Sequence, residues 1–450
     1  MLGSVPDLNF TGFTISGAAG MNPRFTPIAL AALFVFSLTS GALAQDVAPG
    51  PRAAVDGQSA PVPGVKFLRV QPMSITAHPD FLNGRLPAGR PAPSAASKVT
   101  PSLDTVPLFS RSFFSHGLEW PYTMIGGEPS LGRATHVPTK IVFVSLELQN
   151  ADLTTTTLVP IEPFEQKILD SPNFRKSDYA SGNGLQFGDA VQRAEFFRSM
   201  QDNWHTELNP VETVERITVR VPRTVSVDVN GKPTAVRTYF RGSADDGSVV
   251  VLLLDRFFDD AFTNTAVNAI NGGAFTTDSL NLVVMPNTYI FSLEGGNQGP
   301  LTLGFHTFFF ADVTPTPVWI AGFASWISPG FFLGTDIADV TALSHEISEA
   351  INDPLLNNAV PAWEFPGFPG SCQDNLETGD PIEALVTETV PVAIDSHGER
   401  IVYHPQNEAL LQWFEQKPKS DALHGAFSFP DTRALPGPAT FFGQLSCPTQ

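Results

Sequence analysis

The segment 343–354, LSHEISEAINDP, contains residues whose types and spacing could bind a metal ion. His345 and Glu349 are four residues apart, so on a helix they are neighbours on one face. An imidazole and a carboxylate at this spacing can share a cation, and Glu346 can accept a proton from a metal-bound water. The segment therefore predicts a metal site with His345 and Glu349 as ligands and Glu346 as the catalytic base.

A third protein ligand is expected further along the chain, because a catalytic metal site usually has three. Asp353 follows the motif directly, and Glu377 and Asp380 lie within CQDNLETGDPIE (372–383). Glu377 is the preferred ligand, since a downstream Glu completes the site in one branch of the zincin metallopeptidases. Three histidines outside the motif remain further options: His306, His397 and His404.

The motif departs from the usual zincin pattern, because it reads HExxE where zincins read HExxH. A carboxylate in place of the second histidine makes a bound metal less electrophilic. It also loosens the selectivity of the site for one metal over another. Zn is the expected cofactor, with Ca or Mn as alternatives.

A helix must position these side chains, and the sequence predicts one from about Asp336 to Asn352. Asp336, preceded by a threonine, is expected to cap its N-terminus. Pro354 is expected to end it by forcing Asp353 out of helical geometry. An apolar stripe at helical spacing should face the core beside the ligands; it consists of Ile337, Val340, Leu343, Ile347 and Ile351.

Strand and helix patterns are mixed in the rest of the chain. Strands are expected at 140–148, 248–255, 280–286, 288–294 and 304–325, a hairpin with an Asn230-Gly231 turn at 216–240, and helices at 164–169, 189–200 and 257–270. This mixture predicts an α+β fold with a single zincin-like domain, built from a mixed β-sheet and the metal-site helix.

The N-terminal part predicts export. Residues 21–44 contain one Arg, an apolar run and Ala-Leu-Ala before Gln45, which is the layout of a signal peptide; an uncleaved N-terminal anchor is the alternative. The expected organisation is upstream residues and signal peptide at 1–44, a Pro/Ala-rich linker or pro-segment at 45–104, and a catalytic-like α+β domain at 105–450.

The only two cysteines are Cys372 and Cys447. In the oxidising surroundings of an exported protein they are expected to form a disulfide. Such a bond would tie the C-terminal tail to the segment that carries Glu377 and Asp380.

The charge balance narrows the choice of partners. The chain has 45 acidic and 26 basic residues, a formal net charge of −19. Because an acidic surface repels nucleic acid and anionic lipid, we expect no nucleic-acid partner and no membrane contact after signal cleavage. The expected partner is an extracellular peptide or polymer substrate, and the expected location is extracellular or periplasmic.

Several segments together resemble a group of uncharacterised secreted bacterial and fungal zincin-like proteins with an HExxE…NDP motif. These are THVPTKIVFVSLEL (135–148), FGDAVQRAEFF (187–197), LSHEISEAINDP, CQDNLETGDPIE, YHPQNEALLQWF (403–414) and GAFSFPD (425–431). The resemblance implies one continuous domain from about Thr135 to the end. It also implies a shared role for His345, Glu346, Glu349, Asp353, Glu377 and Asp380.

Two functions follow from these observations. The first is a secreted metal-dependent hydrolase that uses metal-activated water, with a zincin-like metallopeptidase as its favoured form. The second is a non-catalytic secreted or cell-wall-associated protein whose metal is structural and clamps the motif helix to the 372–383 segment.

Overall fold

The computed structural model describes residues 65–66, 105–210, 215–229, 232–292, 301–311, 316–332, 335–364, 372–383 and 388–439. The expected signal peptide, most of the 45–104 segment and Cys447 lie outside these residues. Export, a pro-segment and the Cys372–Cys447 disulfide therefore stay predictions.

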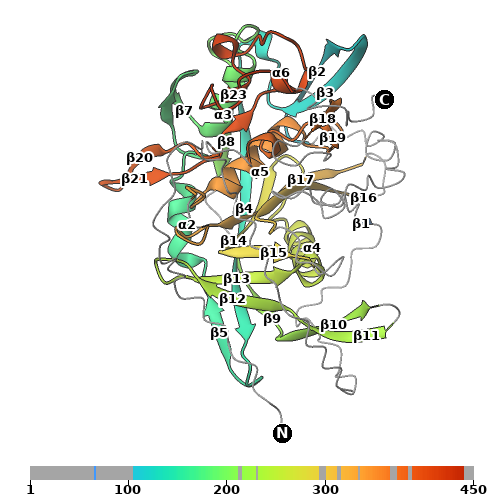
Figure 1. The fold of residues 1–450 in the computed structure, drawn as a ribbon, viewed down its shortest axis with the longest axis vertical. Helices are drawn as coiled ribbons and strands as arrows, with labels where there is room; N and C mark the ends of the chain where they lie inside the picture. Colours follow the sequence, from blue (N-terminus) through green and yellow to red (C-terminus); the bar gives the residue numbers. More distant parts are fainter. Residues whose placement is uncertain are drawn as a thin grey trace, which may run out of the picture.

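A mixed β-sheet forms the centre of the fold (Figure 1). Its order is β1-β16-β17-β14-β4-β5, and β8 and β9 also pair with the long strand β4. Strand β14 runs parallel to both of its neighbours, whereas β16 is antiparallel to β17. The strands are β1 (Val65–Lys66), β4 (Ala134–Gln149), β5 (Thr156–Val159), β8 (His205–Pro210), β9 (Glu215–Val221), β14 (Leu280–Pro286), β16 (Gly304–Ala311) and β17 (Val318–Trp326).

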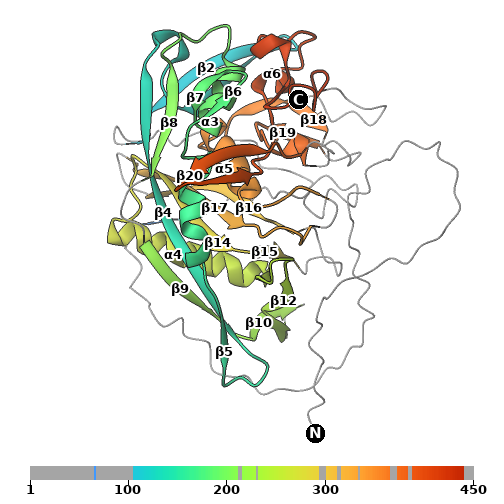
Figure 2. The same ribbon diagram turned by 90° about the vertical axis from the view of Figure 1, so that its left-hand side faces the viewer.

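Helices cover both faces of this sheet. Successive residues of a strand point to opposite faces, and in β14 Leu282 packs in the same core cluster as Leu343 of α5, whereas Val283 packs with Phe258 of α4. Helices α4 and α5 therefore lie on opposite faces, and the two ribbon views agree (Figures 1 and 2). The helices are α2 (Glu162–Leu169), α3 (Phe187–Glu195), α4 (Asp255–Gly272), α5 (Thr341–Asn352) and α6 (Leu411–Phe414).

Smaller sheets surround this core. They are β2–β3 (Leu108–Ser115, Leu118–Ile125), β6–β7 (Ser177–Tyr179, Gly182–Leu185), β10–β11 (Thr224–Val229, Lys232–Arg237), β12–β13–β15 (Tyr239–Ser243, Val249–Leu254, Thr288–Phe291), β18–β19 (Ala359–Glu364, Cys372–Asn375), β20–β21 (Val392–Ser396, Glu399–Tyr403) and β22–β23 (Glu408–Ala409, Ser428–Phe429). Short 3-10 turns occur at Pro129–Leu131, Asp380–Ile382 (η4) and Leu423–Gly425.

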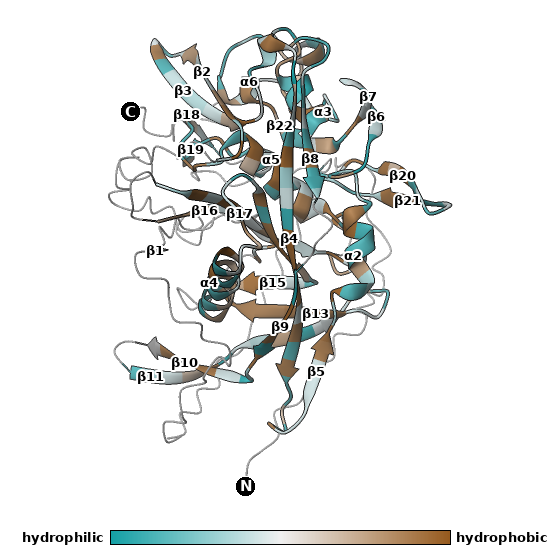
Figure 3. Ribbon diagram, turned by 180° about the vertical axis from the view of Figure 1, so that it is seen from behind, coloured by the Kyte–Doolittle hydropathy of each residue, from teal (hydrophilic) through white to brown (hydrophobic). Residues whose placement is uncertain are grey.

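The hydropathy pattern follows this layering. Strand β14 is buried along its whole length, as expected of a parallel strand covered on both faces. Figure 3 shows mostly hydrophobic residues in the central strands, and both hydrophobic and hydrophilic residues on α4. None of the helices in the described part of the chain is long and apolar enough to cross a membrane.

The expected mixed sheet and most of the expected elements are confirmed. The hairpin expected at 216–240 was wrong in its extent. Only β10 and β11 form it, with Val229 opposite Lys232, whereas β9 pairs in parallel with β4. The Asn230-Gly231 turn itself lies outside the described residues. The sequence of β9 alternates polar and apolar residues and contains no proline. This pattern suits a strand in a hairpin and a strand in the large sheet equally well, so periodicity alone could not predict which strand β9 pairs with.

The motif helix begins later than the sequence indicated. Helix α5 starts at Thr341, and its N-cap is Val340, with no side-chain cap hydrogen bond, so the expected cap at Asp336 was wrong. Asp339 has a φ of 44° and exchanges two backbone hydrogen bonds with Ile327. That bridge holds the preceding residues outside helical geometry. The predicted end at Pro354 is confirmed, because α5 stops at Asn352.

A buried acid outside the motif predicts how stability depends on pH. Glu195, at the end of α3, is 2% exposed, and its Oε1 accepts a 2.7 Å hydrogen bond from the Leu411 backbone N–H. Burial raises the pKa of Glu195 from 4.5 to about 8, although the Leu411 hydrogen bond opposes this. The folded state thus favours the neutral acid. The neutral Glu195 side chain therefore contributes fully to the stability of the folded state below pH 4.5, and this contribution is lost as the pH rises through about 8.

We expect the Glu195→Gln variant to lose this component of the pH dependence. Urea unfolding of wild type and variant at pH values from 4.5 to 8 measures this component as a change in the free energy of unfolding. The expected change is about 1.4 kcal/mol for each unit by which the folded and unfolded pKa values of Glu195 differ. The exposed residue Glu399 supplies the control, as Glu399→Gln. Identical slopes for wild type and Glu195→Gln would contradict a neutral buried acid.

Candidate metal centre

Helix α5 carries the motif into the interior of the protein. His345, Glu346 and Glu349 are each 1% exposed, because the neighbouring apolar side chains Leu343 and Ile347 pack against the central sheet. The helix is therefore buried on its polar side as well as along its apolar stripe. His345 and Glu349 face each other as their spacing predicted, with Nε2 and Oε1 3.1 Å apart.

Strand β16 adds a second histidine to the cluster. Phe305 packs with α4 on one face of the sheet, so His306, the next residue, points to the other face, toward α5. The His306 Nδ1 atom lies 3.3 Å from Glu349 Oε2, 3.8 Å from Glu377 Oε2 and 3.9 Å from Glu346 Oε2. Sequence reasoning named His306 only as a further option. Because both faces of β16 are largely buried, alternation of polar and apolar residues gave no signal that could have raised it.

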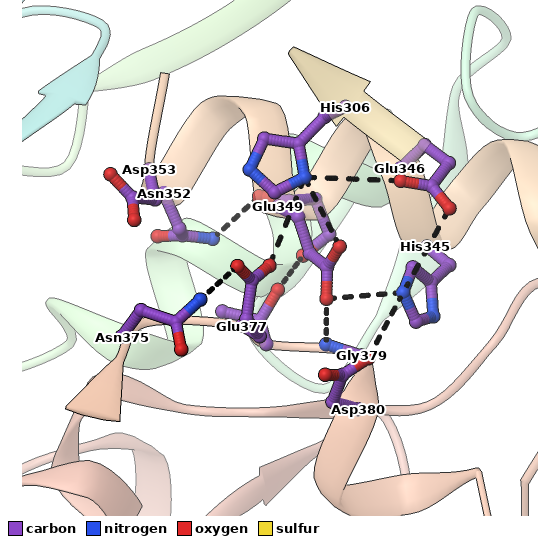
Figure 4. Close-up of polar contacts among 12 residues, drawn as sticks. His306, His345, Glu346, Glu349, Asn352, Asp353, Asn375, Glu377, Gly379 and Asp380 are labelled. Carbon is purple, nitrogen blue, oxygen red and sulfur yellow. Dashed lines mark hydrogen bonds and ion pairs between the residues drawn. The ribbon is translucent and has the colours of Figure 1, made fainter. Parts of the chain in front are cut away.

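The segment after β19 brings two of the expected acidic ligands (Figure 4). Glu377 lies beside His306, and its Oε1 accepts a hydrogen bond from the Asn375 side-chain amide. Asp380 opens η4, with Oδ1 3.7 Å from His345 Nε2 and Oδ2 accepting a 3.0 Å hydrogen bond from Gln373. The structure thus places both carboxylates at the motif helix.

Asp353 stands apart from these contacts. Its Oδ1 accepts hydrogen bonds from the backbone N–H groups of Asn357 and Asn358, at 2.9 and 3.0 Å. Like Glu377, it belongs to neither of the groups of side chains that could hold a metal, but unlike Glu377 it has no oxygen within 4.0 Å of His306 or His345. Burial raises its pKa to about 6. Asp353 therefore organises the turn that follows α5.

The other two optional histidines also lie outside the cluster. His404 Nδ1 is 2.7 Å from Asp339 Oδ2, and this hydrogen bond raises the pKa of His404. The His397 side chain is 72% exposed and faces Asp170. Neither belongs to the groups that could hold a metal.

Two glycines leave room for the cluster. A Cβ at position 379 would lie 2.1 Å from His345 Nδ1, and one at position 304 would lie 2.5 Å from Glu346 Oε1. Real Cβ contacts are never this short, so any other residue at Gly379 or Gly304 would push a cluster side chain aside. The backbone N–H of Gly379 also donates a 3.2 Å hydrogen bond to Glu349 Oε1.

The buried carboxylates of the cluster lack enough positive charge nearby to compensate them. Burial raises the pKa of Glu346 and of Glu377 well above its ordinary range, and that of Asp380 to about 8. Both oxygens of Glu346, Glu349 Oε2 and Glu377 Oε2 are buried without a hydrogen-bond partner. Among the described residues, no Lys or Arg forms an ion pair with any of these carboxylates. Buried carboxylates are costly unless a cation or hydrogen bonds compensate them.

The histidines supply only part of that compensation. Burial opposes ionisation of Glu349, yet His345 and His306 hold its pKa below the ordinary value. Burial also disfavours the charged form of His345, but Glu349 and Glu346 raise its pKa well above 6.5. The carboxylates around His345 thus favour a positive charge at this position.

Gln406 orients the His345 ring as a ligand requires. Its Nε2 donates a 2.8 Å hydrogen bond to the Gly379 carbonyl, so its Oε1 is the atom 3.0 Å from His345 Nδ1. Because Oε1 can only accept, Nδ1 carries a proton, and Nε2 of the neutral ring offers its lone pair to the cluster. Metal-bound histidines are commonly oriented by such a second hydrogen bond.

The spacing of the donor atoms fits a small cation. Tetrahedral Zn with ligands at about 2.0–2.1 Å keeps those ligands about 3.3–3.4 Å from one another. The shorter contacts of His306 Nδ1 and His345 Nε2, at 3.3 and 3.1 Å, are to the two oxygens of Glu349. The other contacts extend to 4.0 Å, a range that small side-chain shifts can close.

Two groups of side chains in the described part of the chain could each hold a metal ion. The first is His306 with Glu346 and Glu349, and the second is His345 with Asp380 and Glu383. Within each group the ligand atoms lie within 4.8 Å of one another. Sequence reasoning missed Glu383, although its position three residues after Asp380 would place both on one side of a helical turn.

Comparison of the chain with protein families, with curated proteins and with solved structures finds no match. The assignment of this region as a candidate metal-binding centre therefore rests on its own geometry. It is a buried set of imidazole and carboxylate donors, brought together from β16, α5 and the 372–383 segment, that could hold a metal.

Proposed function

We propose that this protein is a divalent-metal-dependent hydrolase whose metal is held by the cluster around α5. The observation that carries the proposal is the set of buried carboxylate oxygens on Glu346, Glu349 and Glu377 that have no hydrogen-bond partner and face two histidines. A cation at that point would satisfy all of them at once.

The donor types favour Zn, with Mn as the main competitor. Ca prefers six to eight oxygen ligands, and imidazole nitrogen is a poor ligand for it. Structural Zn sites are usually rich in cysteine, whereas His and carboxylate sets are typical of catalytic sites. The cluster contains His306 and His345 with carboxylates and no cysteine, so its chemistry supports catalysis better than a purely structural role.

A bound metal of this kind lowers the pKa of a coordinated water toward neutrality. The role of the chain is then to accept the proton and to exclude bulk water. Glu346 suits the first task, since both of its oxygens lie in the cluster without a hydrogen bond. Its neighbours His345 and Glu349 remain as ligands. Glu346, His345 and Glu349 are each 1% exposed, and this burial excludes bulk water.

We propose an extracellular peptide or polymer as the substrate, because metal-activated water of the kind that this cluster could supply hydrolyses such bonds. We propose secretion as the setting, on the basis of the signal-peptide pattern at 21–44.

One observation favours the second candidate, a structural metal. The ligands are almost fully buried and come from three separate segments, so that a cation would fasten α5 to β16 and to the 372–383 segment. In this case the metal would matter for folding while no substrate reached it.

We expect His306 to be required for metal binding. The purified wild-type chain should gain about 2.7 kcal/mol of stability at a free Zn concentration 100 times its Kd, and lose it when a chelator is added. The His306→Ala variant should bind Zn at least ~10-fold more weakly, because one nitrogen ligand is gone. Isothermal titration and thermal unfolding measure both effects.

The exposed His397 supplies a matched control, and His397→Ala should bind Zn as the wild type does. If chelation leaves the unfolding temperature of the wild type unchanged and no Zn or Mn binds, the metal proposal is wrong for both candidate functions.

The Glu346→Gln variant separates the two candidates. It should keep its bound metal and lose hydrolysis of an unstructured peptide mixture by ~10²–10⁴-fold, because the proton acceptor is removed. Release of new amino groups measures the rate, with Glu399→Gln as control. Full activity in Glu346→Gln would exclude its role as base. Metal-dependent stability without turnover in the wild type would favour the structural candidate.

A further inference from the structure

The contacts of the cluster divide into two halves that share one carboxylate. On one side His306 Nδ1 faces Glu377 Oε2 and Glu349 Oε2, at 3.8 and 3.3 Å. On the other side His345 Nε2 faces Asp380 Oδ1 and Glu349 Oε1, at 3.7 and 3.1 Å. Each half thus has one imidazole, one carboxylate of its own and one oxygen of Glu349 (Figure 4).

We propose that the centre holds two divalent cations bridged by the Glu349 carboxylate. One cation would lie between His306, Glu377 and Glu349 Oε2, and the other between His345, Asp380 and Glu349 Oε1. The proposal rests on the proposed function in that both require a metal here, but it adds a second ion that hydrolysis with a single metal does not need.

Charge balance supports two ions. Four carboxylates lie within 4.0 Å of the two histidines, those of Glu346, Glu349, Glu377 and Asp380, and the two imidazoles are neutral when they act as ligands. One divalent cation would leave two of these negative charges uncompensated in a region where the four side chains are at most 1% exposed. Two divalent cations would compensate all four, and Glu383, a fifth carboxylate in the group around His345, adds negative charge that also favours two ions over one.

The fixed orientation of His345 supports the second ion independently. Gln406 requires a proton on Nδ1, so the lone pair of a neutral His345 faces Glu349 Oε1 and Asp380 Oδ1. Three electron-rich atoms facing one another repel unless a proton or a cation lies among them. Glu383 belongs to the same group of potential ligands, so this half has enough donors for an ion of its own.

Glu346 occupies a different position from Glu349. Its two oxygens also face the two histidines, but at the longer distances of 3.9 and 4.0 Å. It therefore lies next to both cation positions. It belongs with His306 and Glu349 to one group that could hold a metal, but Glu377 and Asp380 lie slightly closer to the two histidines, at 3.8 and 3.7 Å, and would supply the ligands of the bridged centre. In a two-metal centre, in which the ions hold the attacking and the leaving oxygen, this is the place for a proton acceptor.

Metal stoichiometry and magnetic coupling test the proposal. The full-length chain, stripped of metal with a chelator and dialysed, is titrated with Mn²⁺. We expect two equivalents per chain, and an electron paramagnetic resonance spectrum in which the signal of isolated Mn²⁺ is replaced by that of a coupled pair. The Asp380→Asn and Glu377→Gln variants should each bind one Mn²⁺ with an uncoupled spectrum, and His397→Ala should behave as the wild type.

Each outcome decides between one ion and two. A wild type that binds a single Mn²⁺ overturns the bridged centre and leaves the proposed function standing, whereas a wild type that binds none overturns both. Two bound ions with an uncoupled spectrum would place the second ion elsewhere and reject Glu349 as the bridge. The wild-type measurements stand even if a variant fails to fold, which its circular dichroism would reveal.

Discussion

The structure depends on how it deals with acidic side chains in its interior. Glu346, Glu349, Glu377 and Asp380 lie within a few ångströms of two histidines, at 1% exposure or less. An ionised carboxylate buried without a partner is among the most unfavourable groups that a folded protein can contain. No purely structural benefit is apparent from placing four together where aliphatic side chains would pack as well. Such a set of buried donors could hold a metal ion, and the surrounding packing holds it in place.

The central sheet carries the candidate site on the same face as its larger apolar cluster, which includes α5, and a smaller apolar cluster with α4 covers the other face. In β16, Phe305 and Phe309 join the α4 core, whereas His306 faces α5. In α5 the apolar residues pack against the sheet, while His345 and Glu349 face the 372–383 segment. The candidate metal centre is thus part of the core, and its potential ligands gain the rigidity of the elements that carry them.

The sequence could predict the local part of this site. The i, i+4 spacing of His345 and Glu349 needs only a helix, and the helix was clear from its apolar stripe. Their side chains meet as expected. Glu377 and Asp380 were candidates because a third ligand was expected downstream of the motif, and the structure places both beside it. The mixed sheet followed from the mixture of strand and helix patterns along the chain.

What depended on tertiary pairing could not be predicted. His306 lies in a strand whose two faces are both buried, so no alternation of polar and apolar residues marked which face held the site. The start of α5 is set by the bridge between Asp339 and Ile327, a contact between distant positions that overrode a good capping residue at Asp336. Gln406 fixes the His345 ring from far along the chain, and a single sequence gives no sign of that contact.

The potential ligands come from β16, α5 and the segment around η4, and this has a consequence for when a metal ion could be acquired. None of the three segments alone offers more than a fragment of the donor set, so an unfolded chain would have little affinity for a cation. An ion bound at this site would be loaded only after α5 docks onto the sheet, from the compartment in which the chain folds. Metal supply in that compartment would then decide which ion the mature protein carries.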